Sequence, residues 1–69
     1  MNKSTSPGKG LLDHVRAGFV ARGTSLNKWC EEQGILYPNA RQALIGSWNG
    51  PKGIALRERL IQAASDAHV

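Results

Sequence analysis

The sequence predicts an all-helical domain built from four short helices. Apolar residues recur at spacings of three and four along four successive segments, and glycine or proline stands between these segments. No stretch alternates apolar and polar residues as a half-buried strand would. The chain has 69 residues, a length that allows one domain with a small core and excludes a spacious enzyme cleft between two domains.

The first predicted helix runs from Leu11 to Arg22. One apolar stripe follows its length and comprises Leu11, Leu12, Val15, Phe19 and Val20. Gly23 ends the helix, because glycine adopts the left-handed conformation at no steric cost. Gly18 lies inside the helix, where glycine costs about 1 kcal/mol relative to alanine. We expect Gly18 to let another helix approach closely.

The second predicted helix is capped by Thr24 or Ser25, whose hydroxyl can accept from exposed backbone N–H groups. Its inner face comprises Leu26, Trp29 and Cys30, and its outer face comprises Asn27, Lys28, Glu31 and Glu32. Because this cap follows Gly23 almost directly, a minimal turn joins the second helix to the first. Gly34 ends the second helix.

The third predicted helix runs from Pro38 to Ile45, and proline suits its first position because the missing N–H would be unpaired there. Its inward residues are Ala40, Ala43 and Leu44, and Gly46 closes it. Pro51 opens a fourth helix whose apolar stripe comprises Ile54, Leu56, Leu60, Ile61 and Ala64. We expect Arg57 and Arg59 to lie in solvent. Trp48, in the intervening loop, either plugs the core between these two helices, which we favour, or is exposed for a partner.

The charge balance is basic, with nine Lys and Arg against five Asp and Glu, which gives a net charge of +4. Residues 1–10 are predicted to form a flexible basic arm carrying Lys3 and Lys9, and residues 11–69 a single domain. The alternative for this arm is a disordered leader without a function. No apolar stretch resembles a signal peptide or a membrane span, so we expect a cytoplasmic protein with no membrane partner.

Catalysis and metal binding find no support in the sequence. No His or Ser is spaced to pair with the acidic residues, and no glycine-rich phosphate loop follows a strand. His14 and His68 have no Cys or carboxylate at metal-ligand spacing, so we expect neither metal nor cofactor. Cys30 is the only cysteine, which excludes a disulfide, and we expect it to be a small buried hydrophobe rather than a reactive thiol.

The spacing around Gly34 is typical of two helices that cross steeply. Cys30, a small residue, precedes this glycine by four positions, and the apolar Ile35 follows it directly. Ala40 and the pair Ala43–Leu44 then hold the second helix on the core. Its outward face is rich in Asn, Arg and Gln, side chains that form paired hydrogen bonds with base edges.

On these residues, Ser25 to Leu44 resembles the helix-turn-helix DNA-binding regulators of phages and mobile elements. The flanking segments Arg22–Leu26 and Trp48–Gly53 are similar to the small Ner-type transcriptional regulators. The resemblance implies that the third helix enters the major groove and that Lys28 faces phosphate. It assigns base or backbone contact to Tyr37, Asn39, Arg41 and Gln42.

Two positions depart from the helix-turn-helix pattern. Gln33 stands where a buried apolar residue is usual, and Pro38 follows an aromatic, so the third helix could begin one residue away from Pro38. Each assignment also has a structural alternative: Arg41 and Gln42 as a solvated helix face, and Tyr37 as a side chain packed beside Pro38.

The sequence indicates a transcriptional regulator that binds double-stranded DNA sequence-specifically, and we favour a repressor. Arg41 is the favoured base-reading residue, and the phosphate contacts are assigned to Arg22, Lys28, Lys52, Lys3 and Lys9. Two-fold operators call for a homodimer on DNA. The fourth helix could supply that interface, although packing on the first helix explains its stripe better.

The rival function is a protein-binding adaptor or antirepressor that grips a host protein. A single exposed patch of Tyr37, Ile45 and Trp48 would favour this function, because aromatic anchors dominate protein interfaces. A basic face centred on the third helix would favour DNA.

Overall fold

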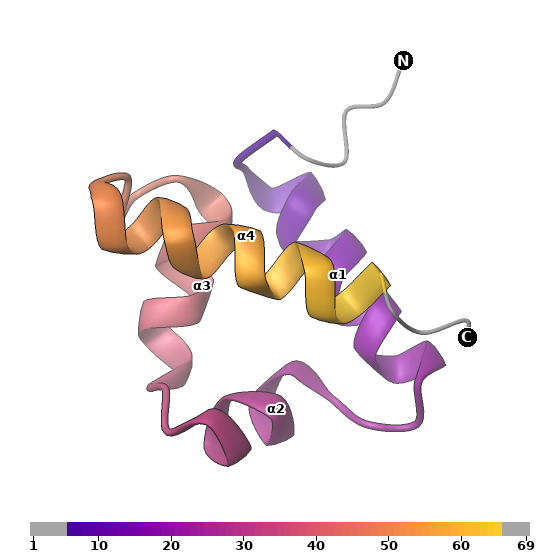
Figure 1. The fold of residues 1–69 in the computed structure, drawn as a ribbon. Helices are drawn as coiled ribbons and strands as arrows, with labels where there is room; N and C mark the ends of the chain where they lie inside the picture. Colours follow the sequence, from indigo (N-terminus) through magenta and orange to yellow (C-terminus); the bar gives the residue numbers. More distant parts are fainter. Residues whose placement is uncertain (1–5, 66–69) are drawn as a thin grey trace.

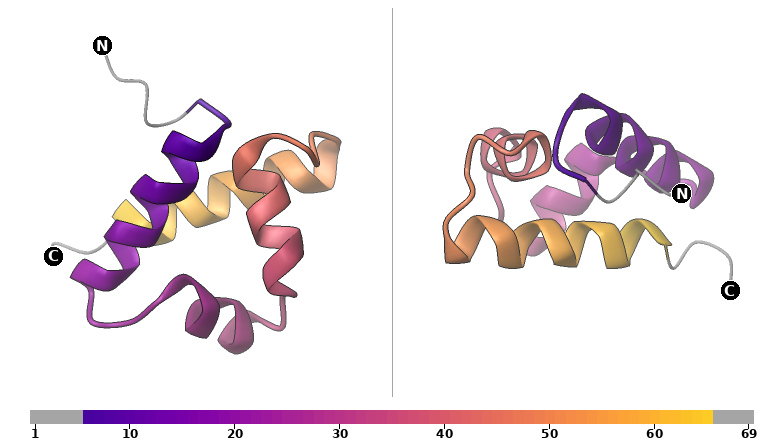
Figure 2. Two further views of the ribbon diagram at one scale, coloured as in Figure 1. Left: turned by 180° about the vertical axis from the view of Figure 1, so that it is seen from behind. Right: turned by 90° about the horizontal axis from the view of Figure 1, so that it is seen from above.

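The computed structural model describes residues 6–65, and within this range the chain forms four α-helices and no strand. The helices are α1 (Lys9–Ala21), α2 (Leu26–Gln33), α3 (Tyr37–Ile45) and α4 (Pro51–Ser65) (Figure 1). The predicted all-helical class is therefore confirmed. Helices α1, α2 and α3 form one layer, and α4 lies across one side of it (Figure 2). The molecule is flat, with extents of 33 × 30 × 17 Å.

The helix ends follow the predicted signals closely. Ser25, rather than Thr24, caps α2: its hydroxyl oxygen accepts from the backbone N–H of Lys28 at 3.1 Å. Gly34 ends α2 with a φ of +71°, in the left-handed region that favours glycine. α3 begins at Tyr37 and not at Pro38, so Pro38 lies within its first turn. The one-residue shift left open by the sequence is thus toward the N-terminus.

The N-terminal segment differs from the prediction. α1 begins at Lys9 and not at Leu11, and the Gly8 N–H donates to the Leu44 carbonyl at 2.9 Å. Lys9 also pairs with Asp13, at 3.4 Å between its Nζ and a carboxylate oxygen. A flexible arm is therefore wrong for residues 8–10, because this segment is tied to the end of α3. Lys3 lies outside the described residues.

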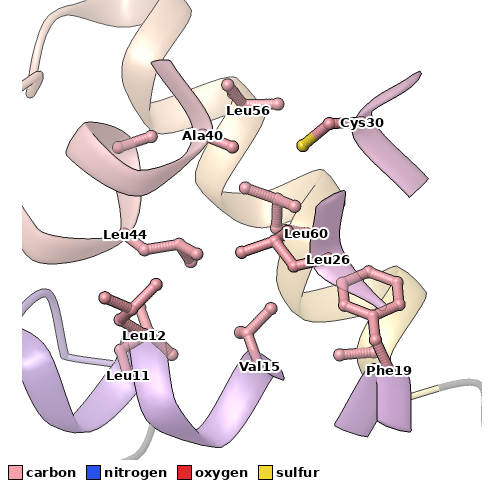
Figure 3. Packing of buried hydrophobic residues seen from close by; sticks show 12 residues of the cluster. Leu11, Leu12, Val15, Phe19, Leu26, Cys30, Ala40, Leu44, Leu56 and Leu60 are labelled. Atoms are coloured by element: carbon pink, nitrogen blue, oxygen red, sulfur yellow. The ribbon is translucent and has the colours of Figure 1, made fainter. Parts of the chain in front are cut away.

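The core comprises one stripe from each helix (Figure 3). Its buried residues are Leu11, Leu12, Val15, Phe19, Leu26, Cys30, Ala40, Ala43, Leu44, Leu56, Leu60 and Ala64. Two predicted members of the stripes are wrong: Val20 is 66% exposed and Ile54 is 40% exposed. Each follows a buried residue directly, Phe19 or Gly53, and one residue turns a helix by about 100°.

The two tryptophans occupy the margin of the core. Trp29 was expected inside, but it is only half-buried: its ring packs against Phe19 on one side, with 5.7 Å between centroids. The Arg59 guanidinium lies over the Trp29 ring, 5.6 Å from its centroid. Trp48 is half-buried and packs against the core, as the favoured alternative predicted.

Arg57 corrects another expectation, because it is only 7% exposed rather than solvated. Both terminal nitrogens of its guanidinium donate to the side-chain oxygen of Asn49, one of them at 3.0 Å. Arg57 lies on the face of α4 that also buries Leu56 and Leu60. It therefore ties the loop after α3 to the inner side of α4.

α1 and α4 approach each other most closely at Gly18. A Cβ atom at this position would lie 2.9 Å from the Cβ of Ala64 and 3.0 Å from its carbonyl oxygen. The expected close approach of another helix at Gly18 is thus confirmed, and Ala64 is the residue it meets.

We expect Gly18→Ala to destabilise the domain. Alanine favours a helix by about 1 kcal/mol over glycine, but forcing extra atoms into a packed contact costs about 1–3 kcal/mol. Gly10→Ala is the matched control, because a Cβ there meets nothing within 4 Å. Urea unfolding followed by circular dichroism compares the two. Equal stability of the two variants would contradict the close contact.

We expect Asn49→Ala to lower the free energy of unfolding by about 1.5–3 kcal/mol, because it leaves a buried guanidinium without its acceptor. Gln33→Ala is the control: it removes an amide acceptor from the exposed Arg59 and costs less than about 1 kcal/mol. The same unfolding measurement checks both. Equal losses of unfolding free energy in the two variants would show that the Asn49–Arg57 hydrogen bonds stabilise the loop no more than an exposed contact does.

Candidate nucleic-acid interface

α3 is held so that one face points away from the core. Ala40, Ala43 and Leu44 are buried on its inner side. At its beginning the turn is fixed by the Ile35 N–H, which donates to the Cys30 carbonyl at 2.8 Å. At its end Leu44 accepts from Gly8, as described above. The exposed residues of this outward face are Pro38, Asn39, Arg41 and Gln42.

The outward face of α3 has two edges, and each adjoins a different hollow. Tyr37 lines a hollow of about 340 Å³ bounded by α1, α2 and α3, which we call the first hollow. Arg41 follows Tyr37 by one turn and therefore lies on the same side of α3. Asn39 lines a second hollow, between α3 and α4. The sequence-predicted residues Tyr37 and Arg41 are thus separated from Asn39.

The first hollow gathers polar side chains from three helices. Arg16 of α1, Asn27 of α2 and Tyr37 of α3 surround an apolar floor that includes Val20 and Leu26. Arg16 and Asn27 are exposed, and Tyr37 is half-buried. The face of the molecule opposite α4 shows α1, α2 and α3 together, with α2 bridging the other two (Figure 2).

The charges near this face are available to a ligand to different degrees. Arg16 and Arg41 form no ion pair with any residue in the described range 6–65. Lys28 is exposed, and its Nζ lies 4.0 Å from a carboxylate oxygen of Glu32, one turn later on α2. Such an exposed pair is worth about 0–1 kcal/mol, so Lys28 can exchange Glu32 for a phosphate at little cost.

Other predicted phosphate contacts lie elsewhere. Arg22 donates through Nη1 to the Ala63 carbonyl at 2.6 Å, so it holds the end of α1 against the last turns of α4. Lys52 lines the second hollow beside Asn39. Lys9 pairs with Asp13 on α1. These residues are not gathered around Tyr37 and Arg41.

Sequence reasoning missed Arg16 and Asn27 as candidates. Asn27 was assigned to an outer helix face, which is correct, and Arg16 lies off the apolar stripe of the first helix, but helical periodicity does not say which outer face adjoins α3. Gln33, the departure from the helix-turn-helix pattern, is exposed and accepts from Arg59 Nη2 at 3.1 Å. The position usually filled by an apolar residue therefore serves here as a link between α2 and α4.

Within residues 6–65, no three His, Cys, Asp or Glu side chains lie close enough together to hold a metal ion. No helix in this range is long and apolar enough to cross a membrane. Comparisons with protein-family models, curated proteins and solved structures found no significant match to this chain. A functional proposal therefore rests on the arrangement of α1, α2 and α3.

We expect the Cys30 thiol to resist alkylation in the folded protein. Cys30 is 1% exposed, and desolvation by burial raises the pKa of its thiol, so the reactive thiolate is scarcer than in a free cysteine. Iodoacetamide labelling near pH ~8, compared with and without urea, measures this protection. Equal labelling rates in the two conditions would show that Cys30 is accessible.

Proposed function

We propose that this protein is a sequence-specific, double-stranded DNA-binding regulator of transcription of the kind found in phages and mobile elements. The observation that carries the proposal is the outward face of α3, flanked by Arg16 of α1 and Asn27 of α2. An α-helix with side chains is about 10–12 Å wide and matches the major groove of B-DNA. In this proposal α2 and α3 act as a helix-turn-helix, with α3 in the groove.

The exposed side chains of α3 have the chemistry that base reading requires. Arg41 can donate two hydrogen bonds to guanine, and Gln42 can pair with adenine through its amide. Arg16, Asn27 and Lys28 lie on the neighbouring helices, where they would meet the phosphates beside the groove. Binding would repress transcription by occupying the promoter, in the cytoplasm of the host cell.

Fewer basic residues would contact phosphates than the composition alone suggests. Arg22 donates a hydrogen bond to the Ala63 carbonyl, so its contribution to phosphate binding would be small. The exposed Lys9–Asp13 pair is as weak as the Lys28–Glu32 pair, but Lys9 does not line the first hollow. Lys52 lies on the α4 side of α3. Arg16 takes over part of the role assigned to them from the sequence.

The protein-binding adaptor receives less support. The patch that would favour it needs Tyr37, Ile45 and Trp48 on one exposed surface, yet all three are half-buried and pack against the core. Tyr37 lines the first hollow and Trp48 the second, so they lie on opposite sides of α3. DNA binding therefore remains the better reading of the α3 face.

A homodimer on DNA belongs to the same proposal, because two-fold operators present two half-sites. The apolar stripe of α4 does not demand a partner, since Leu60 is fully buried and Ile61 half-buried within the protomer. α4 packs on both α1 and α3. Pairing would then occur when two copies occupy neighbouring half-sites.

Arg41→Ala tests the proposal. Binding sites are first selected from random duplexes with the wild-type protein, and affinities are then measured by fluorescence anisotropy. Loss of a bidentate base contact should cost about 1–3 kcal/mol on the selected site and relax the preference at one base pair. Arg59→Ala is the control, because Arg59 lies on α4 beside Trp29: it should weaken all duplexes slightly and equally.

Two results would contradict the proposal. The first is an Arg41→Ala protein with full affinity and unchanged preference, which would remove Arg41 from the contact. The second is absence of duplex binding by the wild-type protein at low salt, since phosphate contacts are strongest there.

A further inference from the structure

The second hollow has a composition that DNA binding does not explain. It lies between the α2–α3 turn, α3 and α4, and has a volume of about 450 Å³. Its apolar lining includes Leu36, Trp48, Ala55 and Leu56, and its basic residues are Lys52 and Arg59. No Asp or Glu within the described part of the chain lines it.

Leu36 leaves an apolar part of the second hollow open to solvent. It is 69% exposed, more than any other large hydrophobic residue of the described range, although it directly precedes the first turn of α3. Ala55 faces the same hollow from α4 and, being small, leaves room beside Leu36. An apolar side chain from a partner would cover Leu36 and gain about 25 cal/mol for each Å² removed from water.

The two cations are placed to hold carboxylates on either side of that apolar side chain. Lys52 and Arg59 are separated by two turns of α4, about 10 Å along the axis at 1.5 Å per residue. Arg59 is already oriented, because Gln33 accepts from it at 3.1 Å and the Trp29 ring lies under its guanidinium. A carboxylate that binds Arg59 therefore pays little of the usual cost of ordering a long side chain.

We propose that the second hollow is the docking site for an acidic segment of another protein, with an apolar side chain seated at Leu36 between two carboxylates about 10 Å apart. A peptide of this composition fits the hollow better than DNA, because phosphates gain nothing from an apolar floor. The first hollow takes no residue from α4, whereas the second takes several. The acidic segment therefore binds on a different side of α3 from the proposed DNA face, and its binding does not depend on DNA.

Peptide selection tests this proposal on the full chain. Random peptides displayed on phage are selected without DNA, and the enriched peptide is compared with a scrambled peptide of the same composition by fluorescence anisotropy. The enriched sequences should combine acidic residues with a leucine or an aromatic. Leu36→Ser and Arg59→Gln should each weaken binding about tenfold, as expected for central contacts of an interface.

The matched controls lie at the first hollow. Val20→Ser removes a similarly exposed apolar side chain, at 66%, and Arg16→Gln removes an exposed arginine; each should change the affinity for the peptide less than about twofold. All four side chains stand at the surface, and circular dichroism verifies that the variants fold.

Four results would overturn the proposal. The first is the enrichment of no acidic sequence, and the second is an equal loss of binding in the control variants. The third is displacement of the peptide by a DNA duplex whose affinity falls as much in Lys52→Gln as in Arg41→Ala, which would make the hollow part of the DNA face. The fourth is a dimer in solution that Leu36→Ser dissociates, which would make a second copy the occupant.

Discussion

The packing of α4 against α1 and α3 is the constraint on which the rest of the structure depends. Leu60 lies fully buried on that face (Figure 3), and Gly18 lets α1 come close to Ala64. α2 buries only Leu26 and Cys30, so its place is set by the helices around it. In so thin a core, the orientation of α3 follows from how well its inner face fits α4. The outward face of α3 is fixed as a consequence.

The elements that local rules govern could be predicted from the sequence. Ser25 caps α2 and Gly34 ends it in the left-handed conformation, and both roles depend only on neighbouring residues. The order of the four helices could be predicted from such local signals as well. The side chains that were misplaced depend on distant contacts. Arg57 can be buried because the Asn49 side-chain oxygen accepts hydrogen bonds from its guanidinium. Val20 is exposed because no helix covers that side of α1. For the candidate site, the polar face of α3 was predictable, but the nearness of Arg16 needed the crossing of α1 and α3.

The two sides of α3 divide the polar and the apolar surface of this small protein. On one side Arg16, Asn27 and Tyr37 offer hydrogen-bonding groups that suit phosphates and bases. On the other side Leu36 and Trp48 offer an apolar floor beside Lys52 and Arg59. Basic residues therefore line two hollows of different chemistry, Arg16 the first and Lys52 and Arg59 the second. The glycine turn before α3 serves both, because it presents the start of α3 to one side and Leu36 to the other.

A map of the surface that DNA covers would test whether the outward face of α3 enters the groove. Amide chemical shifts of the isotope-labelled full chain are recorded while a selected duplex is added. If α3 enters the major groove, the largest changes occur at Arg16, Asn27, Tyr37 and Arg41, and Leu36 and Ala55 are little affected. Shift changes centred on Leu36, Trp48 and Ala55 would contradict the proposed orientation of α3. The absence of any shift change at low salt would contradict DNA binding itself.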